Sequence, residues 1–278
     1  MDLEDIRERI ADIAAASDEK LENRIERLLA LGEEVSSIAD EAESKEDEKA
    51  AAEISALIYE TIIDLLDEAG AGDTPDMLYA CVLLAEAYDT LDRYRPIGML
   101  ARKMLNVDID SDDLDPEVVE GAYSRMADVL EDTVYYRDYI RVVREIMDLR
   151  IKYGKPLEPI KSDIKRYLAI TVLTGGTDPF DRFKPSPELQ ALFSPAELLD
   201  IILHPRVGHL RVDPVEFTER WEKIYYDLSD ELDRLLADEP RRMGYCFMYW
   251  EAKARLLRKA YGIEWRSPRA MNPGVMFY

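Results

Sequence analysis

Apolar residues recur at spacings of three and four along almost the whole chain, and this period is typical of amphipathic helices rather than strands. The widest apolar face covers residues 50–66, and glycines at 70 and 72 end it. Thr74-Pro75, Asp115-Pro116 and Asp213-Pro214 each place a capping residue before a proline, as at a helix start. No β-hairpin signal and no alternation of strands with helices occurs. The sequence therefore predicts an all-α fold built from antiparallel helical hairpins, and it excludes Rossmann-like and barrel folds.

The same pattern places the elements and divides the chain. A loop is expected over residues 175–187, a second loop over 204–213, and an extended tail over 263–278 that packs on the helices because it carries aromatic and methionine side chains. We expect two parts, residues 1–155 and 156–278, which could also form one continuous domain. Helices are expected over residues 2–16, 17–32, 33–41, 50–69, 75–91, 96–105, 116–132, 136–153, 158–173, 195–203, 214–236 and 239–261.

Charge is distributed very unevenly along the chain. Residues 1–150 contain 40 acidic and 16 basic side chains, a net charge of −24, whereas residues 151–278 contain 19 acidic and 20 basic side chains. An acidic half repels phosphate backbones and anionic lipid, so nucleic-acid binding through it is disfavoured. The charge indicates either a solvated, solubilising surface or attraction of a basic partner.

The sequence gives no sign of a membrane or secreted protein. It contains no run of about 18 apolar residues, and it starts with acidic residues rather than a basic and then apolar leader. Cys81 and Cys246 are far apart and are interpreted as small buried apolar residues, not as a disulfide or a metal site. We expect a soluble protein of the cytoplasm that does not bind membranes.

Residues 77–147 resemble tetratricopeptide-like helical repeats. Two stretches, 77–105 and 119–147, carry small or apolar residues at compatible positions, at an offset of 42 residues where the usual repeat is about 34. The alanines at 85 and 127 stand where the motif favours glycine. The matching residues are Leu84, Ala85, Tyr88, Tyr94, Ile97, Ala101 and Met104 in the first stretch, and Met126, Ala127, Leu130, Tyr136, Tyr139, Val143 and Ile146 in the second. The resemblance implies an α-solenoid scaffold that binds another protein on a concave surface.

Residues near the turns of these hairpins are the candidate partner-binding set. The set comprises Tyr88, Tyr94, Arg95, Tyr135 and Tyr136.

An acidic loop offers a candidate cation site. Carboxylates at alternate positions can supply several oxygens to a hard cation, and Glu117 is twelfth when the count starts at Asn106, as in a calcium-binding EF-hand loop. However, Ser111 stands where the sharp turn needs glycine, and Pro116 adjoins the last ligand. The pattern therefore favours a solvated loop over a metal site made by Asn106, Asp108, Asp110, Asp112 and Glu117.

The C-terminal half offers an alternative, a ligand site built from arginine and aromatic residues. His204 and His209 are the only histidines and lie in one loop with Arg206. Trp221 and Tyr225 are four residues apart and share a helix face. Aromatic faces and guanidinium groups together can hold an anionic molecule or a peptide, although such aromatics also form cores.

No catalytic motif is present, so no catalytic residue and no cofactor is assigned. The chain lacks a P-loop, a Gly-x-Ser-x-Gly elbow and a Glu-x-x-His pair. The leading interpretation is a non-catalytic interaction or scaffold protein that binds another protein on its helical-repeat surface, with a basic protein as one option for the partner. Two alternatives stay open: an enzyme or small-ligand binder that uses His204, Arg206, His209, Trp221 and Tyr225, and an acidic decoy that occupies a basic protein. The sequence indicates no oligomeric state.

Overall fold

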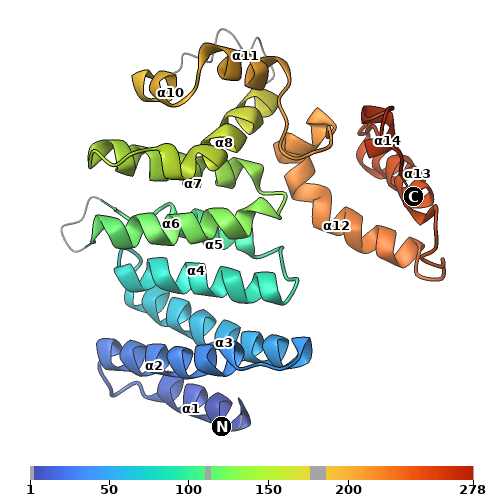
Figure 1. Cartoon of the computed structure of the whole chain (residues 1–278). Helices are drawn as coiled ribbons and strands as arrows, with labels where there is room; N and C mark the ends of the chain where they lie inside the picture. Colours follow the sequence, from blue (N-terminus) through green and yellow to red (C-terminus); the bar gives the residue numbers. More distant parts are fainter. Residues whose placement is uncertain (1–2, 110–113, 176–185, 278) are drawn as a thin grey trace. The chain divides into compact units, whose positions relative to one another are not determined.

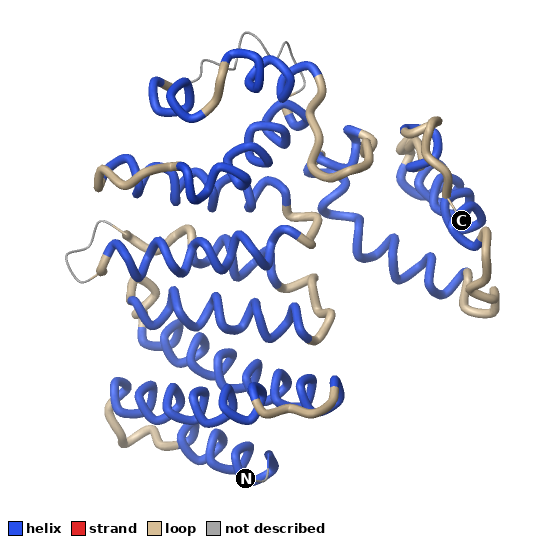
Figure 2. The backbone as a smooth tube through the Cα atoms, in the orientation of Figure 1, coloured by secondary structure: helices blue, strands red, loops and turns tan. Residues whose placement is uncertain are grey.

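The computed structural model describes residues 3–109, 114–175 and 186–277, and every regular element within these ranges is helical (Figures 1 and 2). The all-α prediction is confirmed. The chain divides into two compact units, residues 1–133 and 134–278. The helix over 136–152, which the sequence grouped with the N-terminal part, belongs to the second unit. Over the described ranges, no helix combines the length and the apolar character needed to cross a membrane.

The first unit is a series of helices in which each one packs against the next (Figure 1). Neighbours run antiparallel, as ion pairs show: Lys49 and Asp92 join the start of α3 to the end of α4 at 2.7 Å. Lys103 and Asp67 join the ends of α5 and α3, so these two helices point the same way. The helices are α1 (Leu3–Ala15), α2 (Leu21–Asp40), α3 (Lys45–Ala69), α4 (Pro75–Thr90), α5 (Ile97–Met104) and α6 (Pro116–Glu131).

Helix α2 continues through Gly32, where the sequence suggested a break between two helices. Gly32 is buried, and a Cβ atom at this position would lie 2.6 Å from the hydroxyl oxygen of Tyr59 on α3. Glycine inside a helix costs about 1 kcal/mol relative to alanine. Here it permits the close approach of α3, so the glycine serves packing rather than termination.

The two stretches that resemble tetratricopeptide repeats have different outcomes. Helices α4 and α5 pack together within residues 77–105, as one hairpin of such a repeat would. The stretch 119–147 crosses the division between the two units. The repeat arrangement therefore stays a prediction.

The second unit has shorter helices and longer connections. Its elements are α7 (Tyr136–Lys152), η1 (Glu158–Ile160), α8 (Lys161–Thr174), α10 (Pro187–Leu192), α11 (Pro195–Leu203), η2 (Pro214–Phe217), α12 (Glu219–Leu235), α13 (Tyr245–Leu256), η3 (Leu257–Tyr261) and α14 (Pro268–Met271). Helix α13 starts at Tyr245 instead of residue 239, because Gly244 before it adopts a left-handed conformation with φ of 86°. Ser194 caps α11 in a reciprocal capping box with Glu197, as the Ser-Pro start predicted.

The C-terminal tail packs on α12 and α13. Ile263 and Trp265 are buried in one apolar cluster with Trp221 and Leu228. The tail is not extended throughout, because Ser267 caps the short helix α14, in which Pro268 takes the first position.

Candidate functional site

A groove runs along three helices of the first unit. It encloses about 260 Å³ and follows the helix axes, because its lining residues recur about once per turn on each helix. Most of them have small side chains, which leaves the groove hollow. The lining residues are Gly32, Ser36, Ala39 and Asp40 on α2, Glu48, Ala52, Ser55 and Tyr59 on α3, and Leu83, Glu86, Ala87 and Thr90 on α4.

The groove is acidic at one end. Asp40, Glu48 and Thr90 lie at that end, because α2 and α4 finish where α3 begins. Asp40 and Glu48 are exposed. Within the groove, Glu86 accepts two hydrogen bonds from Arg125 of α6, at 2.7 and 2.5 Å.

Carboxylates also occupy the C-terminal turns of the parallel helices α2, α4 and α6, and none of these helices has a basic residue in its last turn. This placement is unfavourable, because the C-terminal end of a helix carries partial negative charge. Burial and then the negative charges of Asp132, Asp92 and Glu86 raise the pKa of Asp89. Burial, Glu131 and Glu86 raise the pKa of Asp128 in the same direction. The unit therefore holds carboxylates that repel one another and that a cation would stabilise.

The candidate partner-binding residues of the first unit are only partly accessible. Tyr88 is half-buried, and its hydroxyl donates a hydrogen bond to Glu60. Burial raises the pKa of Tyr88. Tyr94 is also half-buried, whereas Arg95 is exposed. None of the three lines the groove.

The two tyrosines of the set that fall in the second unit are packed against its aromatic residues. Tyr135 is 7% exposed, and its ring centroid lies 5.9 Å from that of Tyr226. The ring of Tyr136 lies 4.6 Å from that of Phe217, and burial raises the pKa of Tyr136 to about 12. Both side chains contribute to packing in this structure.

The candidate cation loop falls partly outside the described residues, which leave out Asp110 and Asp112. Asn106 and Asp108 are exposed. Asp115 accepts a hydrogen bond from the backbone N–H of Glu117 at 2.8 Å, and this caps α6. Within the described part of the chain, no three acidic, histidine or cysteine side chains gather in a metal-binding arrangement.

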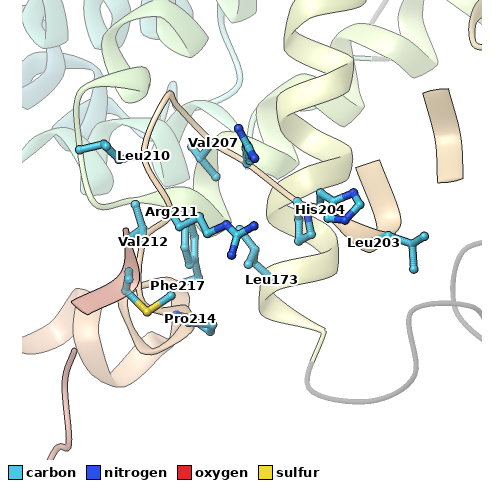
Figure 3. Close-up of a pocket in the computed structure, with 12 residues that line it drawn as sticks. Leu173, Leu203, His204, Val207, Leu210, Arg211, Val212, Pro214 and Phe217 are labelled. Atoms are coloured by element: carbon cyan, nitrogen blue, oxygen red, sulfur yellow. The ribbon is translucent and has the colours of Figure 1, made fainter. Parts of the chain in front are cut away.

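In the second unit, the loop that contains both histidines borders a cavity of about 280 Å³ (Figure 3). His204 and Arg206 line this cavity, and Arg211 contributes a further guanidinium group. His209 is exposed and does not line it. The structure thus brings together two of the five residues of the predicted ligand site.

Trp221 and Tyr225 surround a lysine instead. Trp221 is fully buried, and the ammonium group of Lys253 lies 4.8 Å from its ring centroid. The same ammonium lies 5.7 Å from the ring of Tyr225 and 4.9 Å from that of Trp265. Lys253 is 9% exposed, and this burial lowers its pKa. The three rings stabilise the cation where water cannot.

A buried carboxyl group accompanies this lysine. Glu216 accepts a hydrogen bond from the indole nitrogen of Trp265 at 2.6 Å. Burial raises the pKa of Glu216, and the charge of Lys253 opposes that rise. The arrangement lies in the core and lines none of the described pockets, so we assign it to packing.

Sequence reasoning missed the groove and most of the cavity wall. One signal for the groove was available, because Gly32, Ser36 and Ala39 repeat small side chains on one face of α2. The sequence contains no signal for the burial of Lys253, because this burial depends on contacts with residues that are distant in the chain. Comparison of the chain with protein-family models, curated proteins and solved structures found no match.

Proposed function

We propose that this chain is a non-catalytic interaction protein whose first unit binds a basic helical segment of another protein. The observation that carries the proposal is the groove along α2, α3 and α4, which is hollow, elongated and acidic. Tetratricopeptide-like packing of the hairpins would fit this role, since stacked helix pairs offer elongated surfaces to peptides.

The shape of the groove suits a helix. Its lining extends from Glu48 to Tyr59 along α3, eleven residues apart, which corresponds to about 16 Å of helix axis, or three turns. Small side chains on both flanking helices would let the apolar face of a bound helix approach closely. This is the recognition mode in which an amphipathic helix is laid into a groove.

The negative charge of the groove and of the surrounding unit favours a basic partner. Residues 1–133 contain 37 acidic and 12 basic side chains, a net charge of −25. Lysines and arginines flanking the apolar face of a partner helix would meet Asp40, Glu48 and the helix ends near Asp89 and Asp128. Their approach would relieve repulsion among these carboxylates and would speed association at low salt.

The test fills the groove without changing its charge. Ser36 and Ser37 are both exposed on α2, but only Ser36 lines the groove. We expect Ser36→Trp to weaken binding of a fluorescent, lysine-rich amphipathic helical peptide at least about tenfold by steric exclusion, and the matched control Ser37→Trp to bind like the wild type. Fluorescence anisotropy at low and high salt measures both.

The same experiment separates the proposal from the decoy interpretation. A decoy that acts through net charge alone would bind the peptide equally in both variants, and its affinity would vanish at high salt. A groove binder would retain part of its affinity at high salt through apolar contacts. Equal binding by Ser36→Trp and Ser37→Trp would overturn the groove assignment, and no binding by the wild type would overturn the proposed function.

A further inference from the structure

The cavity in the second unit is bordered by segments that are far apart in sequence. Helix α8 contributes Leu173, the end of α11 contributes Leu203, and the tail contributes Met271. The connection between α11 and η2 forms most of the remaining wall. Its lining residues there are His204, Pro205, Arg206, Val207, Leu210, Arg211 and Val212, followed by Pro214 and Phe217 of η2.

This wall is fixed in place by buried polar side chains. Asn272 is 9% exposed; its side-chain oxygen accepts from the backbone N–H of Arg211, and its nitrogen donates to the backbone oxygen of Arg211, both at 2.9 Å. Asp213 is 6% exposed and accepts from the backbone N–H groups of Val215 and Arg266 at 3.1 and 2.7 Å. The loop is therefore preorganised on both sides of Arg211.

The cavity wall is basic. Arg206 and Arg211 have no carboxylate partner among the residues that the structure describes, although the chain has 59 acidic and only 36 basic side chains. Figure 3 shows the side chain of Arg211 reaching toward Leu173, with His204 on the far side of the cavity. Among the carboxylates that the structure describes near the wall, Asp200 is 70% exposed and lies 3.0 Å from the Nδ1 atom of His204, and Asp213 pairs with Arg266 at 3.1 Å.

The rest of the cavity is apolar. Phe217 is 3% exposed, and Leu173, Val212 and Met271 are half-buried around it. An apolar floor beneath two guanidinium groups is complementary to a molecule with one anionic end and a short hydrocarbon or aromatic body. A volume of about 280 Å³ lies at the lower limit of ordinary ligand pockets, so the molecule must be small.

We propose that this cavity binds a small organic anion, with a carboxylate or phosphate group held by Arg206 and Arg211 and an apolar body against Phe217, Leu173 and Met271. The inference is independent of the protein-binding role proposed for the first unit, because it uses no residue of that unit. His204 faces the same space and adds a third hydrogen-bonding group.

The experiment titrates the full chain with phenyl phosphate, benzoate and the neutral control benzyl alcohol, followed by saturation-transfer nuclear magnetic resonance. The variants are Arg206→Gln, Arg211→Gln and the matched control Arg241→Gln, which alters an exposed arginine of the same unit outside the cavity. We expect saturable binding of an anionic probe and none of benzyl alcohol. Each cavity variant should weaken binding about tenfold, the effect of one charge-assisted hydrogen bond, and Arg241→Gln should have no effect.

The preferred probe identifies the anionic group. Tighter binding of phenyl phosphate supports a phosphate ligand, and tighter binding of benzoate supports a carboxylate ligand. The proposal is overturned if neither anion saturates, if benzyl alcohol binds as well as the anions, or if the cavity variants retain wild-type affinity. Thermal unfolding of each variant establishes that the loss is not a loss of fold.

Discussion

The two units of the chain differ in charge, regularity and aromatic content. The first unit has a net charge of −25 and helices of up to 25 residues joined mostly by short turns. The second unit has 22 acidic and 24 basic side chains, shorter helices, long connections and all three tryptophans of the chain. Regular helix stacking yields an open groove shaped by backbone and small side chains. Irregular packing in the second unit yields a half-open cavity whose wall is held by buried Asn272 and Asp213.

Removing a central aromatic side chain of the second unit should change the free energy of unfolding more than any other substitution considered below. The loss of stability should be confined to that unit. Trp221 is fully buried, stacks on Trp265 at 6.5 Å and covers the ammonium of Lys253. We expect Trp221→Ala to lower the free energy of unfolding by about 3–5 kcal/mol, through the cavity that it leaves and the loss of one ring beside a buried cation. Urea unfolding followed by circular dichroism and tryptophan fluorescence measures this loss.

The reactivity of one cysteine tests whether that loss of stability stays in the second unit. Cys81 is the cysteine of the first unit, and burial raises the pKa of its thiol to about 12, so a thiol reagent should reach it only when that unit opens. Protection of Cys81 should be the same in Trp221→Ala and the wild type. Trp250→Ala, at a half-buried position on α13, is the control and should cost much less. If Cys81 of Trp221→Ala becomes reactive at the lowered urea midpoint of that variant, the two units unfold together. The difference in stability between the units would then be wrong.

A coupled pair of substitutions tests the close packing of the first unit. In the wild type, a Cβ at position 32 would meet the hydroxyl of Tyr59, so we expect Gly32→Ala to destabilise by about 1 kcal/mol despite the better helix propensity of alanine. In a Tyr59→Phe background the same change should cost less, because the hydroxyl at 2.6 Å is gone and only the ring carbon at 3.3 Å remains close. The double-mutant cycle should give a coupling of about 1–2 kcal/mol by thermal unfolding.

Gly121 provides the matched control. It lies on α6 of the same unit, and a Cβ there would meet nothing within 4 Å. Gly121→Ala should therefore stabilise by about 1 kcal/mol through helix propensity alone. Identical effects at positions 32 and 121 would show that the contact with Tyr59 does not determine the position of α3.

The smallest expected change in stability comes from substitutions at the acidic C-terminal ends of the helices. The pKa of Asp89 is raised in the folded state, so this group favours folding only when it is protonated and loses that contribution as the pH rises through the raised pKa. Asp89→Asn should stabilise the first unit by about 0.5 kcal/mol at neutral pH, a small value because the group is only half-buried and solvent screens its charge. The gain should disappear below about pH 4, the range in which the unfolded carboxyl is protonated as well.

Asp92 provides a control of opposite sign three residues away. Its ion pair with Lys49 lowers its pKa, so its contribution is present at neutral pH and is lost on acidification. Asp92→Asn keeps the left-handed backbone at this position, where φ is 58°, and should destabilise at neutral pH. Thermal unfolding across a pH series measures both variants. If both substitutions stabilised the protein, the net charge of the first unit alone would explain their effects on stability, and the ion pair with Lys49 would not contribute.

Helix positions were largely predictable because the signals are local. The Thr74-Pro75, Asp115-Pro116 and Ser194-Pro195 starts appear where the sequence placed them, since capping and proline geometry depend on adjacent residues. Gly32 was misinterpreted, because the distance from this position to Tyr59 depends on the packing of α3. The start of α13 was placed six residues too early for a related reason: propensity alone does not reveal the turn at Gly244.

By itself, the sequence determined the all-α class, most helix boundaries and the segregation of acidic residues toward the N-terminal half, because periodicity, capping and charge are properties of neighbouring residues. Tertiary structure decided which side chains gather. It packed Trp221 and Tyr225 around Lys253, placed Arg211 and Met271 beside His204, and aligned the small residues of α2, α3 and α4 into a groove. These contacts join residues separated by tens of positions in the chain. They depend on how helices pack, which no local pattern encodes.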